Sequence, residues 1–104
     1  MDQFDNVSVV LKANMYFYGQ VTSRTIIFPS GERKTLGIMN VGDYTFGTEK
    51  KELMEILAGR VSVQLSENGD WQIFEAGSKF EVDANSSFKI KVQELCDYCC
   101  SYLD

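Results

Sequence analysis

The stretch Val61–Phe74, with the sequence VSVQLSENGDWQIF, decides the fold class. On both sides of its centre, apolar and polar residues alternate, which is the period of a strand with one buried face. The centre contains Asn68-Gly69, a dipeptide that favours the tight turn between two antiparallel strands. The stretch therefore predicts a β-hairpin, with Trp71 just after the turn.

Outward from this hairpin, short β-prone runs recur with turn residues between them, roughly every 8–12 residues, a spacing typical of a β-sandwich or barrel. Glycine marks several of these turns, as in Pro29-Ser30-Gly31, Ala58-Gly59-Arg60 and Ala76-Gly77-Ser78. The predicted strands are Met15–Val21, Arg24–Phe28, Arg33–Asn40, Tyr44–Thr48, Glu52–Ala58, Arg60–Leu65, Trp71–Glu75, Lys79–Val82, Ser87–Val92 and Cys96–Leu103.

Two segments need separate treatment. Residues 1–13 are irregular and are expected to form an N-terminal arm, with Val7–Val10 as a short strand. Residues 49–57 contain helix formers, but they also fit a buried strand that enters a tight turn, and we favour the strand. Because the chain has 104 residues, the size of one domain, we predict a single all-β domain over residues 14–104.

The chain is acidic, with a formal net charge of −5. Nucleic acids and anionic membranes favour basic surfaces, so this charge argues against such partners but permits a small anion held by one or two Arg or Lys side chains. No apolar run approaches the roughly 20 residues of a membrane span. The acidic start Met1–Asp5 lacks the features of a signal peptide, so a cytoplasmic location is expected.

The absence of histidine restricts the chemistry most strongly. It excludes His-based metal sites and Ser-His or Cys-His nucleophilic pairs. The three cysteines, Cys96, Cys99 and Cys100, are an odd number and do not form a disulfide framework, so we expect them to be reduced. Because adjacent residues of a strand project to opposite faces, Cys99 and Cys100 are expected to point apart, with at least one packing inward.

Two stretches resemble the paired motifs of cupins. Gly42–Phe46 followed by Glu52–Val61 resembles the first motif, in which a Glu precedes a turn glycine by seven residues, as Glu52 precedes Gly59. Glu75–Phe88 resembles the second motif. The resemblance implies a single-domain, cupin-like jelly-roll β-barrel.

The histidine positions of these motifs are occupied by other residues. Phe88 stands where the second motif carries a metal-binding histidine, and Phe46 or Thr48 stands where the histidines of the first motif would fall. We therefore expect no metal ion and no cofactor.

Seven segments, in order and with compatible spacing, carry a closer resemblance. They are Asn14–Gly19, Arg33–Met39, Gly42–Phe46, Glu52–Met54, Trp71, Glu75–Phe80 and Tyr98–Leu103. With them the chain resembles the pyrimidine/purine nucleoside phosphorylase family, small bacterial proteins with a cupin fold. This implies a broad-specificity, metal-free pentosyltransferase of nucleoside salvage, which uses inorganic phosphate as co-substrate to convert purine and pyrimidine nucleosides to free base and pentose 1-phosphate.

The chain departs from the family pattern at three places. Gln20 stands where the family tends to carry a Lys, Ser101 where it often carries an Arg, and Asp83-Ala84 where it often has Pro-Gly. The two lost cations leave Arg33 as the basic residue expected to act on phosphate.

Given this resemblance, Arg33 and Glu52 are the predicted catalytic residues. Arg33 suits phosphate because its planar guanidinium grips two oxygens and stays charged. Glu52 is expected to point into the barrel and to act as an acid or as an acceptor for a ribose hydroxyl. The alternatives are an exposed strand charge for Arg33 and a solvent-facing carboxylate for Glu52. The predicted substrate-binding residues, for which core packing is the alternative, are Tyr16, Tyr44, Phe46, Phe88 and Tyr102.

A second function stays open at this stage, namely a non-enzymatic cupin-like module that binds a small molecule or a protein. Phosphate-dependent turnover distinguishes the two. The expected ligands of the enzyme are nucleosides and phosphate, without a nucleic acid polymer or a membrane. A homodimer is expected in either case, since small jelly rolls commonly pair to protect their exposed strand edges.

Overall fold

A computed structural model of the chain describes residues 2–103, about two thirds of which lie in strands. Antiparallel pairing joins them into a single sheet, and buried and exposed residues alternate along most of the strands, as the sequence period predicts. The elements are β1 (Ser8–Val9), β2 (Asn14–Tyr16), the 3-10 helix η1 (Phe17–Gly19), β3 (Val21–Ile27), β4 (Arg33–Met39), β5 (Gly42–Thr48), β6 (Lys51–Gln64), β7 (Trp71–Glu75), β8 (Lys79–Val82) and β9 (Ser86–Leu103).

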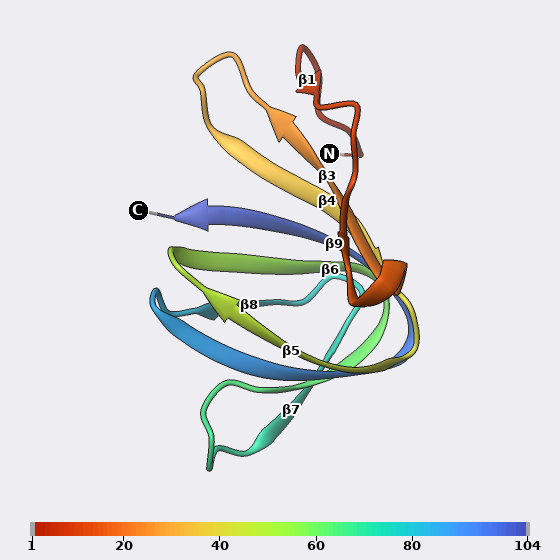
Figure 1. Ribbon diagram of the computed structural model, residues 1–104, viewed down its shortest axis with the longest axis vertical. Helices are drawn as coiled ribbons and strands as arrows, with labels where there is room; N and C mark the ends of the chain where they lie inside the picture. Colours follow the sequence, from red (N-terminus) through yellow and green to blue (C-terminus); the bar gives the residue numbers. More distant parts are fainter. Residues whose placement is uncertain (1, 104) are drawn as a thin grey trace.

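The two longest strands, β6 and β9, are paired with each other and form the spine of the sheet. The first half of β9 pairs with β5 and its second half with β4, while β6 pairs with β8 and then with β7. In Figure 1, β3 and β4 lie at the top and β7 at the bottom, and β9 bends from below β5 to the middle of the molecule, where its second half runs beside β6. The strand order β1-β3-β4-β9-β6-β7 is open, so this all-β, cupin-like fold is not a closed barrel over residues 2–103.

The spine bends where the register between β6 and β9 shifts, between Ile56 and Val61. Gly59 lies in this β-bulge with φ +93°, and a Cβ at this position would lie 2.2 Å from the carbonyl oxygen of Leu95. The turn predicted at Ala58–Arg60 is therefore wrong, because β6 continues through it. A bulge requires the same positive φ as a turn, so glycine alone does not distinguish them.

Two other predicted boundaries also differ from the structure. The separate strands predicted on either side of residues 93–95 are one strand, β9, because these three residues include neither Gly nor Pro to end it. Conversely, the predicted strand Met15–Val21 is interrupted by η1, in which Phe17 and Tyr18 have φ values of 53° and 57°. Left-handed backbone at two aromatic residues has no local sequence signal.

Other predictions agree with the structure. Residues 51–57 belong to a strand rather than a helix, and β6 and β7 form the predicted hairpin, with Gln64 paired to Trp71. Within residues 1–13, β1 lies inside the predicted short strand and pairs with β3. No helix among residues 2–103 is long and apolar enough to cross a membrane.

The core lies between the two halves of the bent sheet. Its side chains come from the inner faces of β3 to β6, β8 and β9, and include Val21, Met39, Met54, Ile56, Val61, Val63, Phe80, Val82, Phe88, Ile90 and Val92. All three cysteines are buried and free of disulfides, as predicted. Cys100 faces this interior, whereas Cys99 lies against the N-terminal residues on the opposite face of β9.

Candidate functional site

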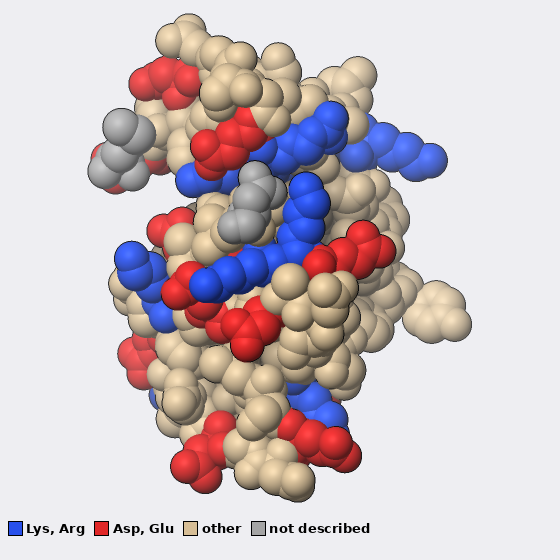
Figure 2. Space-filling view, turned by 90° about the vertical axis from the view of Figure 1, so that its left-hand side faces the viewer, with Lys and Arg blue, Asp and Glu red and all other residues tan. Residues whose placement is uncertain are grey.

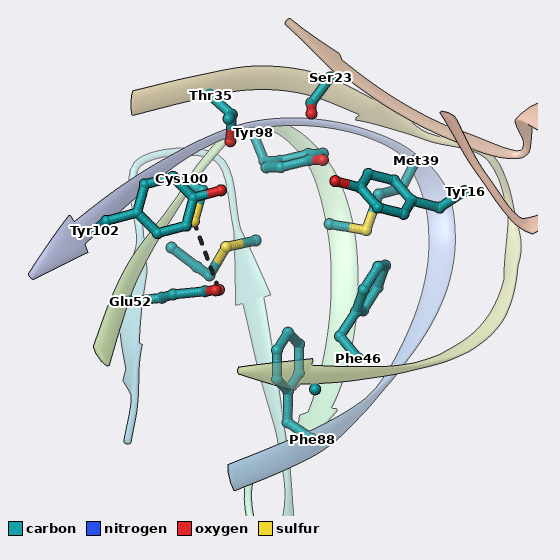
Figure 3. A pocket seen from close by; sticks show the side chains of 12 residues that line it. Tyr16, Ser23, Thr35, Met39, Phe46, Glu52, Phe88, Tyr98, Cys100 and Tyr102 are labelled. Atoms are coloured by element: carbon teal, nitrogen blue, oxygen red, sulfur yellow. Dashed lines mark hydrogen bonds between the residues drawn. The ribbon is translucent and has the colours of Figure 1, made fainter. Parts of the chain in front are cut away.

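A cavity of about 130 Å³ lies between the two halves of the sheet, at one side of the core. Strands β2 to β6 and β9 all contribute to its walls, and Figure 3 shows their side chains converging on it. The residues that line it are Tyr16, Ser23, Thr35, Met39, Phe46, Gly47, Glu52, Met54, Phe88, Tyr98, Cys100 and Tyr102.

The strand period and register place the polar wall of this cavity. Alternate residues of β9 point inward, so Tyr98, Cys100 and Tyr102 stand in one row on its inner face. Cys100 is paired across the sheet with Thr35 of β4, and Tyr102 is paired with Glu52 of β6. Residues from three strands therefore lie side by side, although they are far apart in the sequence.

Tyr98 closes one side of the cavity because β4 carries a glycine beside it. A Cβ on Gly37 would lie 2.7 Å from the ring carbon that bears the Tyr98 hydroxyl, so only glycine leaves room for this ring. The Tyr98 hydroxyl donates a long hydrogen bond of 3.5 Å to the carbonyl oxygen of Thr22. Burial raises the pKa of Tyr98 well above its usual range, so the phenol stays protonated.

Glu52 provides the acidic group of the cavity. Its Oε1 accepts a hydrogen bond from the thiol of Cys100, with a sulfur–oxygen distance of 3.5 Å, drawn as a dashed line in Figure 3. Burial raises the pKa of Glu52, and the hydrogen bond from Cys100 acts in the opposite direction. Burial also raises the pKa of Tyr102 to about 12, so this neighbour is a neutral hydrogen-bonding group.

An aromatic wall faces the polar one. The ring of Phe46 stacks on Phe88 with 5.6 Å between centroids and meets Tyr16 edge-on at 6.4 Å. Tyr44 packs against Phe46 from behind, at 6.3 Å, and its hydroxyl donates to the carbonyl oxygen of Asn40 at 2.7 Å. Tyr16, Phe46 and Phe88 thus line the cavity as predicted substrate-binding residues would, whereas Tyr44 does not reach it.

Arg33 lies outside the cavity lining but on the same face of the sheet. It is the exposed first residue of β4, two positions before Thr35. The pair of β4 and β9 nearest the start of β4 is Lys34 with Ser101, the neighbours of Arg33 and Tyr102 in the sequence. The strand period therefore places Arg33 toward the end of the cavity where Tyr102 is paired with Glu52. Figure 2 shows Lys and Arg side chains in rows across this side of the molecule, the left-hand side of Figure 1, with Asp and Glu side chains between them.

The positions at which the chain departs from the family pattern do not line the cavity. Ser101 is on the opposite face of β9 from Cys100 and Tyr102, and its buried Oγ has no hydrogen-bond partner among residues 2–103. Gln20 is exposed just after η1. Compared with the family pattern, the cavity walls therefore lose no positive charge at these two positions.

Sequence reasoning missed seven of the lining residues. Cys100 and Tyr98 could have been found from Tyr102 by the strand period of two, but Ser23 and Thr35 look like ordinary strand residues. The missed residues are Ser23, Thr35, Met39, Gly47, Met54, Tyr98 and Cys100. Among residues 2–103, no group of three or more Cys, Asp or Glu side chains is arranged to hold a metal ion.

Comparison with known proteins places the chain in a family. A family model described as pyrimidine/purine nucleoside phosphorylase matches residues 11–102. Proteins with that name are 55% identical in Geotalea uraniireducens, with all of both chains covered, and 54% identical in Wolinella succinogenes, with 99% of this chain and 98% of that one covered.

Solved structures agree with this placement. A protein of unknown function from Acinetobacter sp. ADP1 superposes with a TM-score of 0.93 at 40% identity, covering 97% of this chain and 98% of that chain. An RmlC-like cupin from Shewanella frigidimarina shares the fold. It superposes with a TM-score of 0.70 at 13% identity, covering 98% of this chain and 93% of that chain. The fold and the sequence relatives together show that the chain belongs to the pyrimidine/purine nucleoside phosphorylase family.

Proposed function

We propose that the chain is a nucleoside phosphorylase, which cleaves purine and pyrimidine nucleosides with inorganic phosphate to free base and pentose 1-phosphate and needs no metal ion. One observation carries this proposal. All the residues that line the cavity fall within residues 11–102, the part of the chain that the family model matches. The cavity is thus built from the part of the chain that is shared with the phosphorylases.

The two walls of the cavity suit the two parts of a nucleoside. The wall of Glu52, Thr35 and Tyr102 offers hydrogen-bonding groups for ribose hydroxyls. The wall of Phe46 and Phe88 offers ring faces for a base, and aromatic contacts favour such stacked arrangements. The cavity holds about 130 Å³, less than the roughly 300 Å³ of common ligand pockets. It encloses part of a nucleoside, and phosphate reaches the sugar from the open end.

The proposed mechanism follows from the charges at this end of the cavity. Cleavage of the C1′–N bond passes through a transition state with positive charge on the sugar, as in glycoside cleavage. Ionised Glu52 accepts a hydrogen bond from a ribose hydroxyl and stabilises that developing charge. Arg33 holds hydrogen phosphate at the open end. From there a phosphate oxygen forms the bond to C1′ as the C1′–N bond breaks, and the proton of hydrogen phosphate passes to the nitrogen of the departing base.

The test is chromatography of the purified protein after incubation with uridine, inosine and adenosine, with and without phosphate, in the presence of a chelator. We expect free base only with phosphate, at a rate that the chelator does not change. Arg33→Ala should raise the KM for phosphate. The control variant Arg60→Ala, in which an arginine of β6 that pairs with Glu94 at 3.4 Å is removed, should leave this KM unchanged. Base release without phosphate contradicts phosphorolysis. No release by folded protein favours the binding module.

We also propose that the chain works as a homodimer in the cytoplasm. The support for a homodimer is a set of exposed apolar residues along the segment from β1 to η1, since exposed apolar patches mark interaction sites. This set includes Val9, Val10, Leu11, Met15, Phe17 and Tyr18. The three free cysteines are consistent with a reducing compartment. Light scattering tests the dimer, and Tyr18→Ser should weaken it without unfolding the chain.

A further inference from the structure

The contact between Cys100 and Glu52 has no role in the reaction so far. Cys100 is 4% exposed, faces the cavity from β9, and donates its thiol hydrogen to Glu52 Oε1 over 3.5 Å. A thiol is a weak hydrogen-bond donor compared with a hydroxyl. Glu52 is the one carboxylate among the described residues that line the cavity, and this thiol is the partner that the structure gives it.

The cavity walls around Glu52 carry no positive charge that could replace that contact, and Arg33 stands outside these walls, at the open end of the cavity. From β9, Cys100 and Tyr102 face it, and Thr35 of β4 lies beside Cys100 in the sheet. On its other side the paired residue of β8 is apolar Val82, and Tyr16 of β2 lies across the cavity. None of the described residues that line the cavity is a Lys or an Arg.

We propose that Cys100 is a positioning residue for Glu52, whose thiol holds Oε1 in place and leaves the carboxylate free to accept a ribose hydroxyl. This inference rests on the proposed phosphorylase function. A weak donor fits this task because it orients the carboxylate without competing strongly with substrate. A hydroxyl in the same place would hold the carboxylate more tightly, and a methyl group would not hold it.

The electrostatics of the pair support this geometry. Burial raises the pKa of the Cys100 thiol far above its usual range, and the nearby Glu52 raises it further, so the thiol stays protonated and remains a donor. The hydrogen bond from Cys100 opposes the effect of burial on the pKa of Glu52. Removing this donor should therefore raise the pKa of Glu52, and a stronger donor should lower it.

The experiment compares Cys100→Ala and Cys100→Ser with Cys99→Ser as the matched control. Cys99 is the next residue, is equally buried, and lies on the opposite face of β9. The first measurement is kcat/KM for a nucleoside between about pH 4 and 9. We expect the acid limb, on which activity rises with pH, to move to higher pH in Cys100→Ala and to lower pH in Cys100→Ser, and to stay in place in Cys99→Ser.

Above that limb, loss of the positioning contact in Cys100→Ala should reduce kcat/KM roughly 3- to 10-fold, the effect of one hydrogen bond. The second measurement needs no activity. It is the titration of the Glu52 carboxyl carbon by NMR in 13C-glutamate-labelled protein, with the signal assigned by its loss in Glu52→Gln. The same opposite shifts are expected there.

The outcomes separate this inference from the proposed function. If the wild type releases base and neither Cys100 variant moves the acid limb or the Glu52 titration, the positioning role is overturned and the phosphorylase stands. If the wild type releases no base, the phosphorylase fails, and the carboxyl titration alone decides whether Cys100 controls Glu52. An equal shift in Cys99→Ser also overturns the proposal, because it would show a general change in packing.

Discussion

The replacement of Gly37 by alanine tests whether one strand contact shapes the cavity. Gly37 is paired with Ser23 in the sheet, and the ring of Tyr98 lies against it. A Cβ here would lie 2.2 Å from the carbonyl oxygen of Thr22 and 2.7 Å from both the hydroxyl oxygen of Tyr98 and the ring carbon that bears it. Real Cβ atoms essentially never approach another heavy atom closer than 3.0 Å.

The magnitude follows from these distances. To reach 3.0 Å from a backbone oxygen, β3 and β4 have to separate locally by about 0.8 Å, and the densely packed interior does not absorb such a shift freely. Overpacking costs about 1–3 kcal/mol, and displacement of the Tyr98 hydroxyl from its partner adds to this, so we expect about 3 kcal/mol. For a domain of this size the melting temperature should fall by roughly 12–24 °C.

The assay is thermal and urea unfolding followed by circular dichroism, with Gly47→Ala as the control. Gly47 also lies in a strand beside the cavity, but a Cβ there would meet nothing closer than 3.9 Å and its φ is not positive. Alanine is favoured over glycine in a strand interior by about 0.5–1 kcal/mol, so Gly47→Ala should be neutral or stabilising. Tyr98→Phe should not rescue Gly37→Ala, because the closest clash is with backbone. A melting temperature within about 3 °C of wild type for Gly37→Ala would refute the reasoning.

Three further predictions concern stability and reactivity. Burial raises the folded-state pKa of Glu52, so its contribution to stability is complete below its unfolded pKa and is lost as the pH rises through the folded value. Glu52→Gln should therefore raise the melting temperature at neutral pH but not near about pH 4, where the Glu52 carboxyl of the wild type is uncharged, like the amide of the variant. A gain that persists at acid pH, or an equal pattern in Glu55→Gln on the opposite face of β6, would contradict this. Gly59→Ala should lower the free energy of unfolding in urea by more than about 1 kcal/mol, because the bulge needs φ +93° and brings the Leu95 carbonyl oxygen to 2.2 Å from the new Cβ. A smaller loss would show that the bulge tolerates a side chain. Burial raises the pKa of Cys96 to about 11 and also raises the pKa values of Cys99 and Cys100. The native protein should therefore not react with a disulfide reagent at about pH 8, whereas all three thiols should react in denaturant. Fast reaction of the native protein would show that a thiol is accessible.

Local pattern accounts for the class of fold and for the orientation of side chains. The alternation in Val61–Phe74 and Asn68-Gly69 between its arms predicted the β6–β7 hairpin, and the structure contains it. The resemblance to the first cupin motif predicted that Glu52 points inward, and the period of two puts it on the same face as Met54 and Ile56, where the structure has them. These properties depend on neighbours within a few residues, so the sequence determines them without knowledge of the rest of the chain.

Local pattern could not predict where strands continue or which residues meet across the sheet. Gly59 marks a bulge rather than a turn because β6 stays paired with β9 on both sides of it. Likewise, Thr35, Cys100 and Glu52 carry no signal that they share a cavity until the register of β4, β9 and β6 brings them together. Composition, strand period and turn chemistry are properties of the sequence itself, whereas register and bending arise from contacts between distant segments. For this reason only the tertiary structure decided the shape of the cavity and the pairing of Cys100 with Glu52.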